Sequence, residues 1–254
     1  MSLLHAVAIF GAGIIAGTIN TVVGSGTLFT FPILLTFGYA PVVANVSNTV
    51  GLVPGSVSGA LGYRRELAGQ TRRGLPLAIA SATGAVVGSV LLLTLPASAF
   101  KAIVPAFICI ALVAILLQPR LSRAVRARRH EGVRDAGTQQ AGALATVAVF
   151  GSGVYGGYFG AAQGILLLAI LGLALDDELQ RINALKVVLA GLVNLIAGLI
   201  FVFVANVAWL PALLIAVGST VGGVIGARGG RRLPPWALRA VIIVVGIVAI
   251  VRLL

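Results

Sequence analysis

Two short stretches of the chain combine small and polar residues with the start of an apolar run, an arrangement that could bind an anion. The candidate binding residues are Gly24, Ser25, Gly26 and Thr27 in the first stretch and Gln163 and Gly164 in the second. A helix that begins inside a membrane directs unsatisfied N–H groups and a partial positive charge at whatever precedes it, which suits an oxyanion. We expect the N–H groups of Thr27, Leu28, Gly164 and Ile165 to serve in this way. Glycine lets a ligand approach the backbone, and the serine and glutamine side chains add donors.

A second polar cluster lies on the apolar segment that follows each stretch. Its candidate binding residues are Asn45, Asn48 and Thr49 in one half of the chain and Asn183 and Lys186 in the other. Residues three apart in a helix share a face, so Asn183 is expected beside Lys186. A lysine inside the membrane would supply a fixed positive charge for an anion. The alternative, equally well supported, is that its side chain extends to the membrane surface.

Close packing of helices is another explanation for the small residues, because small residues four apart let membrane helices approach each other. We expect Gly13 and Gly17 to serve only in packing. For Gly24 and Gly26 we favour a binding role, because a short apolar run follows them. Asn194 is expected to make a hydrogen bond between helices, with a binding role as the alternative.

The composition places these segments in a membrane. Of the 254 residues 59% are apolar and 9% are charged, and mean hydropathy is +1.10. No soluble fold of this length could bury so much apolar surface, so we expect an all-α polytopic membrane protein. Eight segments approach the roughly 20 residues that span the hydrocarbon, namely 2–22, 42–62, 74–94, 98–118, 141–160, 183–205, 208–227 and 235–253. Two shorter ones, 27–38 and 164–175, would reach only about 18 Å and are expected to be broken or re-entrant helices.

The basic residues orient these segments. If all ten segments cross the membrane, 16 of the 18 basic residues fall on one side in four groups: Arg64, Arg65, Arg72 and Arg73; six arginines in 120–134; Arg181 and Lys186; and Arg228, Arg231, Arg232 and Arg239. By the positive-inside rule this side is cytoplasmic. The net charge of +12 therefore needs no nucleic-acid partner. The basic stretch 120–135 could also contact anionic membrane lipid, although a topology signal explains it more simply.

The ten segments divide into two repeats, residues 1–118 and 141–254, on either side of a basic cytoplasmic linker at 119–140. Gly13 and Gly17 of the first repeat match Gly153 and Gly157 of the second, and Asn45 matches Asn183. Because each repeat has an odd number of segments, the second enters the membrane from the opposite face. This pattern predicts two inverted-topology repeats of about five segments each, with a substrate site near the midplane and transport by alternating access.

The motifs in both halves resemble those of the sulfite exporter TauE/SafE family of membrane permeases. The matching residues are Gly13, Ala16, Gly17, Asn20, Gly24, Gly26, Pro32, Leu34, Ala44, Asn48, Thr49, Tyr63, Arg64 and Arg65 in the first half, and Gly153, Gly156, Gly157, Phe159, Gly160, Gly164, Arg181, Asn183, Ala184 and Lys186 in the second. The resemblance covers nearly the whole chain. It implies export of small sulfur oxyanions or organosulfonates, such as sulfite or sulfoacetate, across a bacterial inner membrane. The two glycine-rich loops depart from the family pattern, reading Gly24-Ser25-Gly26 and Ala162-Gln163-Gly164, so the resemblance does not carry over a particular substrate.

Neither catalysis nor a cofactor is indicated by the sequence. It contains no nucleophile elbow, no HExxH motif and no P-loop, so we expect no catalytic residues. The six acidic residues lie in or beside expected loops, which argues against a proton relay within the membrane and against transport of a multivalent cation. The two histidines, His5 and His130, are isolated, so no metal site is expected. We therefore expect a secondary carrier for a small anion. A channel-like facilitator, a transporter of another small solute and a membrane assembly protein are the alternatives, and assembly into a homo-oligomer is left open.

Overall fold

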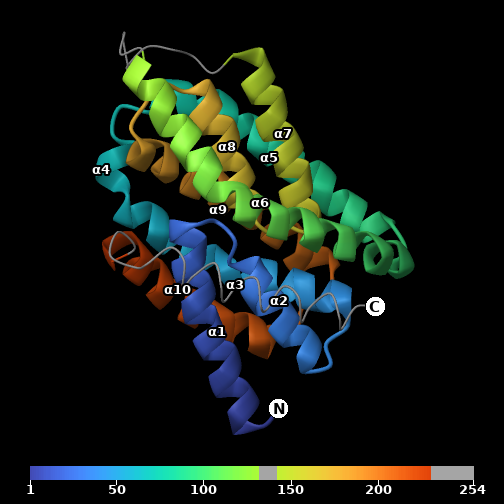
Figure 1. Ribbon diagram of the computed structural model, residues 1–254. Helices are drawn as coiled ribbons and strands as arrows, with labels where there is room; N and C mark the ends of the chain where they lie inside the picture. Colours follow the sequence, from blue (N-terminus) through green and yellow to red (C-terminus); the bar gives the residue numbers. More distant parts are fainter. Residues whose placement is uncertain (132–141, 230–254) are drawn as a thin grey trace.

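The computed structural model describes residues 1–131 and 142–229, and all regular structure in these ranges is helical (Figure 1). The helices are α1 (Leu3–Val22), α2 (Thr27–Thr36), α3 (Pro41–Gly62), α4 (Arg64–Leu67), α5 (Thr71–Thr94), α6 (Ala97–Glu131), α7 (Ala143–Tyr158), α8 (Gln163–Ala174), α9 (Leu179–Val204) and α10 (Trp209–Gly229). Nine of the ten predicted segments coincide with a helix, and the tenth, 235–253, lies outside the described residues. The all-helical class is confirmed.

Fewer full spans are confirmed than were predicted. Within the described ranges five helices are long and apolar enough to cross a membrane: α1, α5, the Ala97–Leu117 part of α6, α9 and α10. Helix α7 has 16 residues, fewer than a full span needs. Helix α3 has 22 residues but carries the asparagine cluster and several serines, which lower its hydropathy. Two of the eight expected full spans are therefore not confirmed, and a third lies outside the described residues.

Helix α6 continues further than expected. It runs to Glu131, well into the stretch 119–140 that was predicted to be a linker. The stretch from Arg120 to Glu131 contains five arginines and two alanines, which have high helix propensity, and so it extends the helix beyond the apolar segment.

Both predicted helix breaks are confirmed. Helix α1 ends at Val22 and the 10-residue α2 begins at Thr27, with Gly24 between them at a φ of 89°. Helix α7 ends at Tyr158 and the 12-residue α8 begins at Gln163, after Gly160 at 73° and Ala162 at 58°. Positive φ is a left-handed backbone conformation that glycine adopts readily and that cannot continue a right-handed helix. Each short helix therefore follows a sharp turn instead of continuing the helix before it.

The helices form two groups that do not follow chain order. Helices α1, α3 and α10 pack together in the lower part of Figure 1, and α5, α7 and α9 pack together in the upper part. Helix α10 comes from the second half of the chain and α5 from the first, so the halves are interleaved.

Glycines make the close contacts within these groups. A Cβ on Gly17 of α1 would lie 2.3 Å from the carbonyl oxygen of Ser219 in α10, and a Cβ on Gly13 would lie 3.0 Å from the Ile215 Cα. These two glycines therefore serve in packing, as predicted. In the other group, a Cβ on Gly88 of α5 would lie 2.0 Å from the Val154 carbonyl oxygen in α7.

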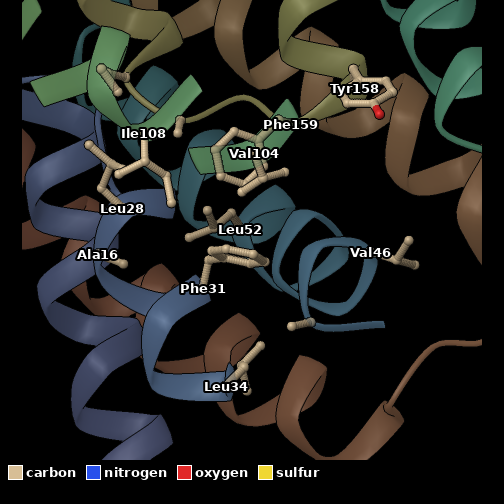
Figure 2. Packing of buried hydrophobic residues seen from close by; sticks show 14 of the residues in the cluster. Ala16, Leu28, Phe31, Leu34, Val46, Leu52, Val104, Ile108, Tyr158 and Phe159 are labelled. Carbon is tan, nitrogen blue, oxygen red and sulfur yellow. The ribbon is translucent and has the colours of Figure 1, made fainter. Parts of the chain in front are cut away.

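The two groups meet along α3 and α9 and around an aromatic cluster. Asn194 of α9 donates to the Ser56 hydroxyl of α3 over 3.5 Å, the interhelical hydrogen bond that the sequence predicted. Phe31 of α2 packs edge-on against Phe159, which follows α7, with ring centroids 5.1 Å apart (Figure 2). Phe100 of α6 contacts both rings. This aromatic cluster therefore connects the short helix after the first break with the residue that follows α7 at the second break.

The basic groups gather at one end of the molecule. Asp177, just before α9, accepts hydrogen bonds from Arg73 of α5 and from Arg181 of α9. Arg228 of α10 borders the same pocket as Arg64. Burial raises the pKa of the Asp177 carboxyl. Hydrogen bonds from the two arginines and from a backbone N–H lower it by more than burial raises it, so the pKa lies below its ordinary value. Parts of three of the four predicted basic groups thus share one end, in agreement with the predicted topology.

Candidate functional site

The two helix breaks touch each other at a pair of glycines. The N–H of Gly164 donates to the carbonyl oxygen of Gly24 over 3.0 Å. A Cβ added to either glycine would lie 2.4 Å from the Cα of the other, so no larger residue fits without moving a backbone. Stretches from the two halves of the chain therefore meet at one crossing point, where the sequence predicted a shared site.

The backbone amides at this crossing are largely engaged within the chain. Of the four amides expected to face an anion, three donate to carbonyls: Gly164 to Gly24, Leu28 to Ser25 over 3.2 Å, and Ile165 to Ala162 over 2.9 Å. Buried N–H groups need partners, and the turns supply them. In this conformation those three N–H groups already have acceptors within the chain and are not free to bind an anion, which differs from the expectation.

Lys186 caps the end of helix α1. Its side chain is fully buried, and Nζ donates to the carbonyl oxygens of Asn20 and Thr21 over 3.3 and 3.2 Å. Asn183, one turn earlier on α9, donates to the Thr21 carbonyl over 3.5 Å. The last carbonyls of a helix lack partners and carry partial negative charge, so an ammonium is well suited to them. Lys186 does not extend to the membrane surface, and the snorkelling alternative is wrong.

Asn45 makes the corresponding contact in the other direction. Its Nδ2 donates over 3.0 Å to the carbonyl oxygen of Tyr158, the last residue of α7. Asn45 and Asn183, which the sequence aligns, thus each bind the end of the helix that precedes the break in the opposite half. This reciprocity brings both clusters predicted from sequence to the crossing.

Several of the other predicted residues have their hydrogen bonds satisfied locally. Asn48 accepts from Thr30 and donates to the Thr27 hydroxyl over 3.3 Å. Thr49 donates to the Asn45 carbonyl within α3 over 3.0 Å. Gln163 is buried and donates to the Ser152 carbonyl over 3.1 Å. These contacts fix the two short helices against α3 and α7.

Four buried side-chain atoms in the described part of the chain have no hydrogen-bond partner, and they lie on the elements that form the crossing. They are Ser25 Oγ, Asn45 Oδ1, Ser152 Oγ and the Tyr158 hydroxyl. Buried polar groups are normally paired, so such atoms are places where a ligand or water completes the structure. Sequence reasoning included the first two and missed Ser152 and Tyr158. The signal available for both was a polar group within an otherwise apolar segment that precedes a predicted break.

The described residues contain no cluster of three His, Cys, Asp or Glu side chains that could hold a metal ion. The polar groups at the crossing are hydroxyls, amides and one ammonium. Such a set binds through hydrogen bonds and one positive charge.

Comparison with known proteins identifies the family. The model of the sulfite exporter TauE/SafE family matches residues 9–253. The chain belongs to this family. It is therefore a multi-pass membrane transporter of the TauE/SafE type, as its apolar helices also indicate.

Curated relatives cover almost the whole chain. The probable membrane transporter protein ORF9 of Sinorhizobium sp is 30% identical over 248 residues, which cover 97% of this chain and 91% of the relative. The probable membrane transporter protein YfcA of Escherichia coli K12 is 27% identical over 252 residues, covering 97% and 88%. A probable membrane transporter protein of Haemophilus influenzae is 25% identical over 220 residues, covering 87% and 83%. No solved structure matches the chain significantly.

Proposed function

We propose that this protein is a secondary transporter that exports a small anion, a sulfur oxyanion or an organosulfonate such as sulfite or sulfoacetate, across a bacterial inner membrane. The observation that carries the proposal is the buried Lys186 ammonium at the junction of two broken helices. The family description as sulfite exporters supplies the chemical class. The relatives are bacterial, and the basic end of the molecule suits the cytoplasmic side of their inner membrane.

The charge of Lys186 favours an anion. An ammonium has three N–H donors, and two of them have acceptors in the structure, both carbonyls. None of the ion pairs among the described residues involves Lys186. A buried charge without a counter-charge is costly. An oxyanion would accept from the third donor and neutralise the charge.

The unpaired hydroxyls support a ligand with several acceptor oxygens. Ser25, Ser152 and Tyr158 can each donate one hydrogen bond from a buried oxygen that now has no partner. A sulfite or sulfonate group presents three oxygens, so it could accept from the lysine and from hydroxyls together. We propose that Ser152 and Tyr158 join the predicted residues in binding.

Correspondences between the halves support inverted repeats. Gly13 and Gly17 of α1 pack on α10, and their counterparts in the second half, Gly153 and Gly157 of α7, pack on α5. Asn45 and Asn183 make reciprocal caps. We propose that alternating access consists of movement of the group α1, α3 and α10 relative to the group α5, α7 and α9. The moving bodies would then differ from the chain halves 1–118 and 141–254, because the halves are interleaved.

Transport in reconstituted vesicles tests the proposal. The purified full-length protein should move sulfite, or another oxyanion from a panel of sulfate, thiosulfate, sulfoacetate and carboxylates, with saturable kinetics. The same anion should raise the melting temperature, because a ligand of the native state stabilises it. Flux that does not saturate would indicate a channel instead of a carrier. Equal flux of uncharged analogues would indicate a neutral substrate instead of an anion. Absence of any flux across the panel would refute the proposal.

A further inference from the structure

A pocket of about 590 Å³ lies at the basic end of the molecule. It is formed where α3 and α10 end and α4 begins, and the charged residues that line it within 1–131 and 142–229 are Arg64, Arg65, Glu66 and Arg228. These described side chains, three arginines and one glutamate, carry two net positive charges. None of the residues proposed for the transport site lines it. The transport proposal therefore does not account for this pocket.

The three arginines of the pocket differ from Arg73 and Arg181 at the same end. Arg73 and Arg181 are held by Asp177. Arg64, Arg65 and Arg228 are all exposed. None of them takes part in the ion pairs that the described residues form with Asp177. Guanidinium groups without a carboxylate partner are suited to bind phosphate, often with two parallel hydrogen bonds.

Apolar surface borders the pocket on α3. Leu61 lines the pocket and is 62% exposed, and Val57, one turn earlier on the same face, is 51% exposed. An exposed apolar strip that leads to a basic pocket matches the two parts of a phospholipid. A soluble phosphate would need the arginines but not the strip.

We propose that this pocket binds the phosphate head group of an anionic phospholipid from the cytoplasmic leaflet, with an acyl chain along Val57 and Leu61. Basic pockets at the cytoplasmic ends of transmembrane helices are suited to such head groups. The site is distinct from the basic stretch 120–135, and its occupation does not depend on the identity of the transported anion.

Native mass spectrometry of the full-length protein in detergent tests this site. Phosphatidylglycerol is added to the wild type and to variants, with phosphatidylcholine as the reference lipid. Each basic residue near the membrane strengthens the binding of an anionic lipid about fivefold. Each single Arg→Gln change should therefore weaken phosphatidylglycerol binding about fivefold, and the double variant R64Q/R228Q should weaken it about 25-fold. The matched control is R72Q, an exposed arginine of the same end that does not line the pocket. This control should bind like the wild type.

Three results would overturn the proposal. The first is a loss in R64Q/R228Q no greater than in R72Q. The second is equal occupancy by phosphatidylcholine and phosphatidylglycerol. The third is displacement of the lipid by glycerol 3-phosphate at the same concentration, which would make the pocket a site for soluble phosphates. If the double variant aggregates on size exclusion, the single variants R64Q and R228Q decide the test, each with an expected loss of about fivefold.

Discussion

Replacing Gly164 with alanine tests whether the two broken helices must touch. The new Cβ would lie 2.4 Å from the Gly24 Cα and 2.9 Å from its carbonyl oxygen. Ordinary van der Waals contact begins near 3.4 Å, so the two backbones must separate by about 1 Å. Neither partner can rotate away, because both atoms belong to the backbone.

The cost follows from two terms. A separation of about 1 Å would stretch the 3.0 Å hydrogen bond from Gly164 N–H to Gly24 O beyond bonding distance, a loss of about 1 kcal/mol. The strain of inserting a methyl group into a well-packed core adds about 1–3 kcal/mol. We therefore expect G164A to lower the free energy of unfolding by about 2–4 kcal/mol and to abolish flux.

Gly151 provides the matched control. It lies inside α7, and a Cβ there would meet no atom within 4 Å. The same change in this place should leave stability equal or raise it slightly, because alanine is the better helix former. The measurements are melting temperature in detergent and sulfite flux in vesicles. If G164A melts and transports like G151A, the close contact of the two breaks is not required and the site proposed at the crossing fails.

Three further predictions concern the ammonium, the first break and the acid–base cluster at the basic end. Lys186→Gln should weaken binding of a divalent oxyanion at least tenfold in calorimetry, because loss of a charged hydrogen bond costs about 1.5–3 kcal/mol. Ser25→Ala should weaken the binding less. Unchanged affinity in the Lys186→Gln variant would remove Lys186 from the site. Gly26→Val should abolish flux while the protein still inserts in the membrane, because its Cβ would lie 2.4 Å from a carbonyl oxygen of α1, and retained flux would leave this glycine without a role in the site. Asp177→Asn should lower the melting temperature at pH 7; because the native pKa of this carboxyl is depressed, the wild type loses the same stability as the pH falls below about 4, and the two proteins should converge there. A difference between them that stays constant with pH would refute this assignment.

The sequence predicted the helices well because their signal is local. An apolar run of a given length and a glycine interruption are properties of consecutive residues, and both breaks and nine segments follow from them. The count of full spans is confirmed only in part. Helix α3 devotes part of its length to Asn45, Asn48 and neighbouring serines, and a polar helix of this kind is stabilised by the groups that it meets in the fold.

Helix partners could not be predicted from the same signal. The sequence indicated two repeats without predicting helix partners. In the structure α10 packs on α1 and α3, and α5 packs on α7 and α9. The relevant pattern is a pair of glycines four residues apart on each partner helix, Gly84 and Gly88 in α5 and Gly218 and Gly222 in α10. Such pairs predict close packing without specifying the partner. Only the contacts show which helices the glycines bring together.

The role of Lys186 was open in the sequence because both alternatives considered only the lysine. The structure adds its partners, the last carbonyls of α1, which the break leaves without intrahelical donors. The side chain is therefore structural as well as a candidate for anion binding, and loss of function in most variants would not separate the two roles. Glutamine separates them, since its amide can still donate to the carbonyls but carries no charge. A Lys186→Gln protein that keeps its melting temperature and loses anion-induced stabilisation would assign the charge to binding. A lower melting temperature with unchanged anion-induced stabilisation would leave the lysine only as a helix cap.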